Sequence, residues 1–103
     1  MSEPVRLSLE EVHALCRDTL VAARLGEEHA QAIARSIARA EADECHSHGL
    51  YRLIGYVASA RSGKAERHAL PVLTKTTPAI LRVDAKRGFA TLAIATGMPA
   101  LIA

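Results

Sequence analysis

Residues 8–26 read SLEEVHALCRDTLVAARLG and decide the first element of the fold. Ser8 and Glu11 form a capping-box pattern, in which each side chain accepts a hydrogen bond from the other residue's backbone N–H. Gly26 occupies the place of the glycine that often follows a helix end. The apolar residues of one face recur at steps of three and four: Leu9, Val12, Cys16, Leu20 and Ala23. The stretch therefore predicts a helix over residues 9–25 with one buried stripe.

Two further helices are predicted by the same periodicity. The first starts after Gly26 and continues to Glu41, with two glutamates in its first turn, where the helix dipole favours them. Its polar residues Arg35, Arg39 and Glu41 are expected on more solvated faces. The other helix covers about residues 50–61 and ends near Gly63. Its expected apolar stripe consists of Leu50, Leu53, Ile54 and Val57, whereas Arg52, Tyr56 and Ser59 point elsewhere.

The C-terminal half has a less regular pattern. Residues 71–78 contain two prolines and three threonines, which is typical of an extended segment or a loop. Residues 80–84 read ILRVD and predict a short strand. Residues 89–95 follow a glycine and are predicted to be helical because of their alanines. The predicted fold class is mainly α: three helices, a short strand and a partial fourth helix.

Length and composition indicate one domain of modest size. The 103 residues are 50% apolar and 23% charged, which excludes the composition of a disordered segment. Twenty of them are alanines, and the aromatic residues are one Phe and two Tyr. Small side chains bury little apolar area each, so we expect a small hydrophobic core that depends on contact with a partner surface.

Charge and cysteine content exclude several classes of partner. The net charge is only +2 and the basic residues are scattered singly, which argues against a nucleic acid partner. No apolar stretch has the length of a membrane span, and the first residues lack the apolar region of a secretory signal. The two cysteines, Cys16 and Cys45, are too few for a disulfide framework. We therefore expect a cytoplasmic protein with reduced thiols and no membrane partner.

Side chains capable of proton transfer and anion binding gather after the second predicted helix, in the segment DECHSHG at residues 43–49. If the next helix begins near His48, Arg52 lies four residues further on the same face, with Ser47 at the junction. An arginine binds a carboxylate through two parallel hydrogen bonds, and a histidine can give up a proton near neutral pH. A serine can orient that imidazole or relay its proton. The trio Ser47, His48 and Arg52 is predicted to bind and protonate an anionic carbonyl compound.

A metal site is the rival interpretation of the same segment. Cys45, His46 and His48 are all of metal-ligand type. Three such close neighbours in the chain cannot readily point at one tetrahedral ion, and no second pair of ligands follows. We therefore expect no metal here. A surface or purely structural role for His48 stays open.

The remaining histidines and the aromatic residues have no partners of catalytic type nearby in the sequence. His13, His29 and His68 are interpreted as surface residues. Tyr51 and Tyr56 are expected to pack against the core or to anchor an interface. Cys16 lies in the apolar stripe of the first helix and is assigned to the core.

The string EADECHSHGLYR, residues 41–52, resembles the N-terminal part of the type 2 malate/L-lactate dehydrogenase family. The S-H-G-x-x-R element at residues 47–52, followed by Tyr56, is specific in combination, and the resemblance spans residues 5–103. The family includes ureidoglycolate and sulfolactate dehydrogenases and the reductases of Δ1-piperideine-2-carboxylate and Δ1-pyrroline-2-carboxylate. The run Gly88-Phe89-Ala90 departs from the glycine-richer run common in the family and is closer to its imine reductases.

The resemblance implies an NAD(P)-dependent oxidoreductase that transfers a hydride between nicotinamide and C2 of a small carboxylic acid. That acid would be a 2-hydroxy or 2-oxo acid or a cyclic imino acid. Carried over by position, His48 would donate the proton, Ser47 would be its relay partner and Arg52 would hold the substrate carboxylate. The family does not use the Rossmann fold, which is consistent with the lack of a G-x-G-x-x-G motif.

Family members are several times longer than this chain and are dimeric. The resemblance therefore implies that residues 1–103 are a truncated, helical, substrate-side domain of a larger α/β oxidoreductase. NAD or NADP would be bound mainly by the missing domain, the chain alone would be inactive, and the full-length protein would be a homodimer. The alternative is a non-enzymatic helical interaction module or the remnant of a decayed gene.

Overall fold

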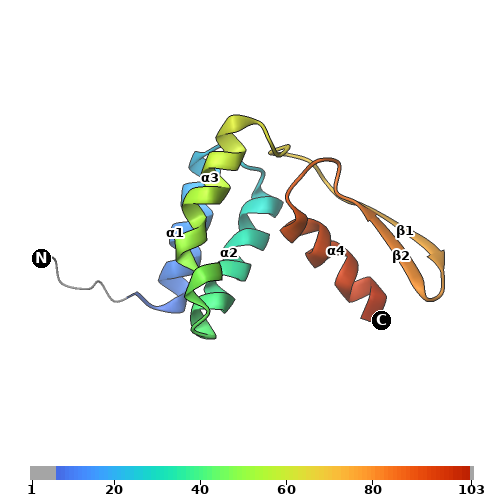
Figure 1. The fold of residues 1–103 in the computed structure, drawn as a ribbon, viewed down its shortest axis with the longest axis horizontal. Helices are drawn as coiled ribbons and strands as arrows, with labels where there is room; N and C mark the ends of the chain where they lie inside the picture. The colour runs from blue at the N-terminus through green and yellow to red at the C-terminus, as the bar shows by residue number, and fades with distance from the viewer. Residues whose placement is uncertain (1–6, 103) are drawn as a thin grey trace, which may run out of the picture.

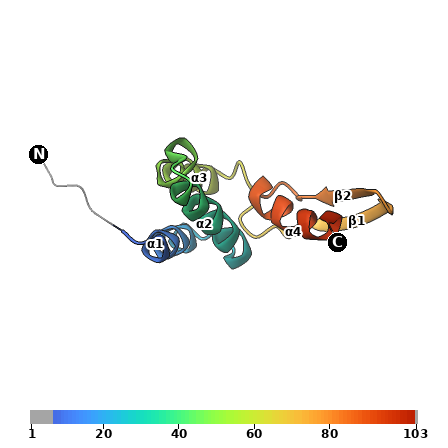
Figure 2. The same ribbon diagram turned by 90° about the horizontal axis from the view of Figure 1, so that it is seen from below.

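The computed structural model describes residues 7–102, apart from the side chains of His46 and Thr76, and it is mainly α-helical, as predicted (Figure 1). Helices α1, α2 and α3 form an up-down-up bundle, and a β-hairpin projects from the other end of the molecule (Figures 1 and 2). Helix α4 packs against both α2 and strand β2. The elements in chain order are α1 (Leu9–Ala22), α2 (Glu27–Ala42), the 3₁₀ turns η1 (His46–His48) and η2 (Leu50–Arg52), α3 (Leu53–Ser62), β1 (Val72–Thr77), β2 (Ile80–Asp84) and α4 (Ala90–Ile102).

Helix α1 starts at the predicted capping box. The Glu11 N–H donates to Ser8 Oγ at 3.1 Å, and the Ser8 N–H donates to Glu11 Oε1 at 3.0 Å. These hydrogen bonds favour the carboxylate and lower the pKa of Glu11. The prediction that α1 ends at Gly26 is wrong, because the helix stops at Ala22 and Arg24 takes the left-handed conformation, with φ 68°.

Gly26 instead precedes α2 and lets two segments approach closely. Its N–H donates to the Arg67 carbonyl at 2.6 Å, and a Cβ at this position would lie 3.0 Å from the same oxygen. A side chain here would push the 62–71 connection away from the bundle. The glycine therefore serves a close approach and not a helix end.

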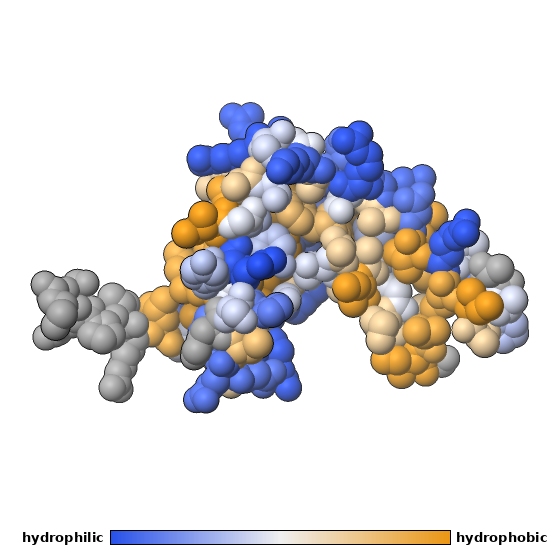
Figure 3. All heavy atoms as spheres, in the orientation of Figure 1, coloured by the Kyte–Doolittle hydropathy of each residue, from blue (hydrophilic) through white to orange (hydrophobic). Residues whose placement is uncertain are grey.

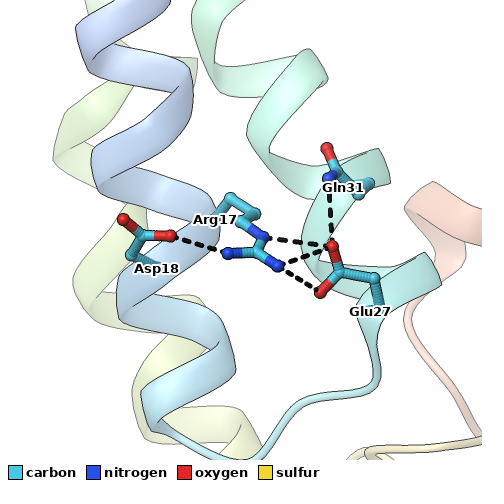
Figure 4. Close-up of polar contacts among 4 residues, drawn as sticks. All are labelled: Arg17, Asp18, Glu27 and Gln31. Atoms are coloured by element: carbon cyan, nitrogen blue, oxygen red, sulfur yellow. Dashed lines mark hydrogen bonds and ion pairs between the residues drawn. The ribbon is translucent and has the colours of Figure 1, made fainter.

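An exposed ion pair fixes the turn between α1 and α2 (Figure 4). The Arg17 guanidinium donates to both carboxylate oxygens of Glu27, at 2.9 and 3.1 Å, and also to Asp18. Gln31 donates to the same Glu27 carboxylate, and Arg17 with Gln31 lowers its pKa. Because these side chains are exposed and screened by water, the cluster orients the two helices more than it stabilises them.

The core is small and rich in alanine, as expected, and lies between α1, α2 and α3. Cys16 is fully buried in it, which confirms its assignment, whereas Leu9 is half exposed. On α3 the predicted stripe is wrong at Ile54, which is 79% exposed, and Tyr56 packs against the core in its place. The 3₁₀ turn before α3 has three residues per turn, so it rotates the helix face relative to a continuous helix. The buried cluster consists of Val12, Cys16, Leu20, Leu25, Ala30, Ile33, Ala34, Ile37 and Ala60.

The interpretation of His29 as a surface residue is also wrong. Its side chain is only 1% exposed, and its Nε2 lies 2.5 Å from the Ala69 carbonyl oxygen. The ring also meets Phe89 edge to face. A polar residue in the first turn of α2 is buried because the 62–71 connection and the start of α4 both fold over it.

The C-terminal unit is a hairpin covered on one side by a helix. The strand predicted at residues 80–84 is confirmed as β2. Of the extended segment and the loop expected for residues 71–78, the structure forms the extended segment, β1. The two strands pair antiparallel, with an irregular register between Lys75 and Thr77. Helix α4 confirms the predicted helical start and continues past Pro99 to Ile102. Its outer face is apolar, as the orange atoms over α4 and the hairpin in Figure 3 show.

Within residues 7–102, no helix combines the length and apolarity needed to cross a membrane.

Gly97 sets the distance between α4 and β2, which gives a matched pair of substitutions. A Cβ at Gly97 would lie 2.6 Å from Val83 Cγ2, whereas a Cβ at Gly55 would meet nothing within 4 Å. We predict that Gly97→Ala lowers the free energy of unfolding by about 1–3 kcal/mol through overpacking. Gly55→Ala should raise it by up to about 1 kcal/mol through helix propensity. Urea unfolding of both variants checks this, and equal effects would contradict the close α4–β2 packing.

Candidate active site

The polar segment predicted to carry chemistry forms a compact turn between α2 and α3. The chain leaves α2 at Asp43, and Glu44 adopts a left-handed φ of 58°. The Cys45 N–H then donates to the Ala40 carbonyl at 2.7 Å, which closes the helix end. Residues 46–52 follow as two short 3₁₀ turns at one end of the helical bundle.

Glu41 holds this turn in place from the last turn of α2. Its Oε1 accepts from the Leu50 N–H at 2.9 Å, at the start of η2. Gly49 is buried beneath the carboxylate, and a Cβ on it would overlap Glu41 Oε1. The prediction that Glu41 faces solvent is therefore wrong, because the carboxylate is half-buried and supplies the acceptor that the backbone of the turn needs. Arg35 and Arg39 are exposed, as predicted.

Ser47 and His48 are brought together by the first 3₁₀ turn. Ser47 Oγ lies 3.0 Å from His48 Nδ1, and Cys45 Sγ lies 3.8 Å from the same nitrogen. If the serine hydroxyl donates to Nδ1, the neutral ring carries its hydrogen on Nε2. All three side chains are exposed, so that Nε2–H is available to a molecule arriving from solvent.

His48 and Arg52 do not lie on one continuous helix. Gly49 separates them with φ −92° and ψ −141°, and the Arg52 N–H donates to the Gly49 carbonyl as part of a second turn. The predicted helix beginning near His48 is therefore wrong, and the helical i, i+4 spacing no longer argues for proximity. Among the described side chains, no hydrogen bond joins His48 to Arg52.

Arg52 lines an aromatic pocket of about 550 Å³ between α3 and the start of α4. Tyr56 and Phe89 form one wall, with ring centroids 5.6 Å apart in an edge-to-face arrangement. Tyr51 is 79% exposed beside the pocket. The lining residues are Tyr51, Arg52, Ile54, Gly55, Tyr56, Ser59 and Phe89, and Arg52 is the only cation among them.

The aromatic wall formed by Tyr56 and Phe89 was not predicted from the sequence. Of the two roles expected for Tyr56, packing and an interface anchor, the structure shows packing against the core, although the helix stripe predicted that Tyr56 points elsewhere, and the ring also lines the pocket. Phe89 lies 33 residues further along the chain (89 − 56) and was not assigned to the site. Two signals were available: Phe89 is the only phenylalanine of the chain, and it lies in the run Gly88-Phe89-Ala90 that resembles the imine reductases of the family.

The described part of the chain contains no group of side chains that matches the rival metal interpretation. Within it, no three His, Cys, Asp or Glu side chains are arranged to hold a metal ion. The His46 side chain lies outside the described residues. Cys45 Sγ lies near His48 Nδ1, and no third His, Cys, Asp or Glu of the described side chains completes a group with them.

The two thiols differ in burial, which makes their reactivity a probe of the site. Burial, with a smaller contribution from the Glu41 charge, raises the pKa of Cys16 from 9.0 to about 11, whereas Cys45 is exposed. At pH 8 we predict that a disulfide reagent modifies Cys45 and leaves Cys16 unmodified until the protein unfolds.

Single-cysteine variants provide the control for this labelling experiment. Cys45→Ser should abolish the fast reaction, and Cys16→Ser should leave it unchanged. Because the folded pKa of Cys16 lies above its unfolded value, its contribution to stability is present below pH 9 and is lost as the pH rises through about 11. Fast labelling of Cys16 in the folded chain would contradict the packing of α1 against α2.

A family model described as malate/L-lactate dehydrogenase matches residues 7–103. Δ1-pyrroline-2-carboxylate reductase of Ancylobacter novellus is 84% identical over 103 residues, which are all of this chain and 30% of that protein. Δ1-pyrroline-2-carboxylate reductase 2 of Burkholderia multivorans is 47% identical over 105 residues, 99% of this chain and 31% of that protein. The chain thus spans about 30% of the length of these curated relatives.

Solved structures with the same fold are also found. Δ1-piperideine-2-carboxylate reductase from Pseudomonas syringae pv. tomato matches with a TM-score of 0.90 and 35% identity, over 96% of this chain and 30% of that chain. Malate dehydrogenase from Pyrococcus horikoshii matches with a TM-score of 0.83 and 22% identity, over 92% of this chain and 27% of that chain. The second likeness concerns the fold alone.

Proposed function

The chain belongs to the malate/L-lactate dehydrogenase family, and we propose that it forms the substrate-side portion of an NAD(P)-dependent reductase of cyclic imino acids. The main support is one structural feature. Ser47 and His48 share a hydrogen bond at a turn that leads directly into Arg52, and Arg52 lines an aromatic pocket. A proton donor, an anion-binding group and a surface for a flat ring are thus supplied by one short segment and its neighbours.

The substrate class follows from the pocket and from the relatives. Δ1-pyrroline-2-carboxylate, named for relatives at 84% and 47% identity, is a ring with a C=N bond and a carboxylate. The Arg52 guanidinium would bind the carboxylate through paired hydrogen bonds. Tyr56 and Phe89 would pack against the ring. A small aliphatic 2-oxo acid shares the carboxylate but has no ring to pack against the aromatic wall.

His48 would supply the proton that the reduction consumes. When a hydride adds to C2 of the imine, the C=N π bond breaks and its electron pair moves to nitrogen, which takes up a proton. The Nε2–H of His48 is the donor in the tautomer that Ser47 favours, and the Ser47 hydroxyl can stabilise the ring on its other side. The exposed position of His48 allows reprotonation from water.

The residues present fit one end of a nicotinamide cofactor. When bound, the reduced nicotinamide ring supplies the hydride. Tyr51 and Tyr56 offer flat aromatic surface beside Arg52, and the pocket volume of about 550 Å³ leaves room for a second ring. Arg52 is the one cation among the lining residues of this pocket, and the substrate carboxylate would occupy it, so this lining offers no second cation for the phosphates of NAD or NADP.

The domain assignment belongs to this proposal. Residues 1–103 would be the helical substrate-side domain, and the longer polypeptide of the relatives would bind most of the cofactor. The chain alone would then be inactive. The full-length protein would be a homodimer in the cytoplasm.

A chimera tests the function directly. Residues 1–103 replace the matched part of the Ancylobacter novellus reductase, to which they are 84% identical. We predict that the chimera oxidises NADH or NADPH in the presence of Δ1-pyrroline-2-carboxylate and that the chain by itself does not. A folded chimera without turnover, or turnover by the chain alone, would contradict the proposal.

Variants of the chimera separate the roles of the two site residues. His48→Gln should lower kcat by about 10²–10⁴-fold, because the positioned acid is lost. Arg52→Lys should raise KM by about 10-fold or more, because the paired hydrogen bonds are lost. His13→Gln and Arg61→Lys, which change the same residue types away from the 46–52 turns and from the pocket lining, should leave both constants unchanged. An unchanged kcat in His48→Gln would refute its assignment as the acid.

A further inference from the structure

His29 is a buried histidine that the proposed mechanism does not use. It lies in the first turn of α2, is 1% exposed, and contacts two segments far away in the chain. Its Nε2 lies 2.5 Å from the Ala69 carbonyl oxygen in the connection after α3, and its ring meets Phe89 just before α4. One side chain therefore joins the bundle to the segment that carries half of the pocket wall.

The hydrogen bonding of the ring fixes its orientation. A carbonyl oxygen only accepts, so His29 Nε2 carries the hydrogen and donates it to Ala69. Nδ1 is then an acceptor, and it is buried without a hydrogen-bond partner among the described residues. A buried nitrogen without a partner destabilises the fold, so an apolar side chain would satisfy the core better. Core stability therefore does not explain why a histidine occupies this position.

The rings of His29, Phe89 and Tyr56 form a continuous edge-to-face series that ends in the pocket. The centroids of His29 and Phe89 are 5.9 Å apart at 67°, and those of Phe89 and Tyr56 are 5.6 Å apart at 62°. Both values lie in the range favoured for edge-to-face aromatic pairs. Of the three rings, Tyr56 and Phe89 line the pocket beside Arg52, and His29 lies behind them.

Gly88 keeps this series tightly packed. A Cβ on Gly88 would lie 2.8 Å from His29 Cε1 and 3.1 Å from Ala69 Cβ. The backbone before α4 can therefore lie directly on the histidine ring, which leaves Phe89 little freedom to move away from it.

We infer that His29 is a positioning residue, which orients Phe89 and through it Tyr56 as the aromatic wall of the Arg52 pocket. The donated hydrogen bond to Ala69 holds the ring plane, and the ring edge holds Phe89. A leucine at this position fills the volume but provides neither. The role of the wall in substrate binding rests on the proposed function, whereas its orientation by His29 does not.

The orientation can be measured in the chain itself, because it contains two tyrosines and no tryptophan. In a Tyr51→Phe background the fluorescence comes from Tyr56 alone. His29→Leu should then raise the acrylamide quenching constant of Tyr56 by about twofold, as the wall loosens. In the matched Tyr56→Phe background, the 79% exposed Tyr51 should show no change. Unchanged quenching of Tyr56 in a folded His29→Leu chain would overturn the inference.

The consequence for substrate binding is measured in the chimera. His29→Leu should raise KM for Δ1-pyrroline-2-carboxylate by about three- to tenfold with kcat within about twofold, since only positioning is lost. Phe89→Leu should raise KM similarly, and the double variant should add nothing further, because His29 acts through Phe89. If the increases in KM caused by His29→Leu and Phe89→Leu multiply in the double variant, the inference is overturned. It is also overturned if His29→Leu leaves KM unchanged in an active chimera. A purely structural role would lower the thermal midpoint without changing KM.

One outcome separates this test from the test of the proposed function. An inactive chimera with the expected change in Tyr56 quenching would refute the function and leave the positioning role intact. Where His29→Leu does not fold, His29→Gln takes its place, because it keeps an N–H donor for Ala69 but has no ring. It should move quenching and KM in the same direction by a smaller factor, and wild-type values in both would overturn the inference.

Discussion

The hydrogen bond from the Leu50 N–H to the Glu41 carboxylate is the constraint on which the rest of the site depends. It ties the last turn of α2 to the first residue of η2 and so fixes how the chain reverses between them. A side chain on Gly49 would overlap the Glu41 carboxylate and displace it from this position, so the glycine preserves the hydrogen bond. Ser47 and His48 lie just before this hydrogen bond and Arg52 lies just after it, so both halves of the site take their position from one half-buried interaction.

Local signals explain most of the fold. The capping box, strand β2 and the start of α4 follow from neighbouring residues and are confirmed, and the α1 stripe is confirmed except at Leu9, which is half exposed. The errors arise from one long-range contact and from one local change of helix geometry. Gly26 permits a close approach by Arg67, and Ile54 is turned outward by the 3₁₀ turn before α3. Neither effect leaves a trace in the periodicity of the surrounding residues.

The candidate site could be predicted from the sequence only as a set of residue types. The S-H-G-x-x-R element pointed to Ser47, His48 and Arg52 as candidates, but the expected helical face is replaced by two turns around Gly49. The pocket wall depends on Phe89, which tertiary packing brings to Tyr56. His29 has the polarity of a surface residue and is buried only because the 62–71 connection and the residues before α4 cover it.

Amide hydrogen exchange at Leu50 tests the central constraint most directly. With its N–H bound to Glu41 beneath the turn, Leu50 should exchange at least about tenfold more slowly than an unprotected amide, and Glu41→Ala should remove that protection. In the same variant the amide of Val12, which donates to the Ser8 carbonyl in α1, should keep its exchange rate. Exchange at the unprotected rate in the unmodified chain, or unchanged protection in Glu41→Ala, would contradict the account.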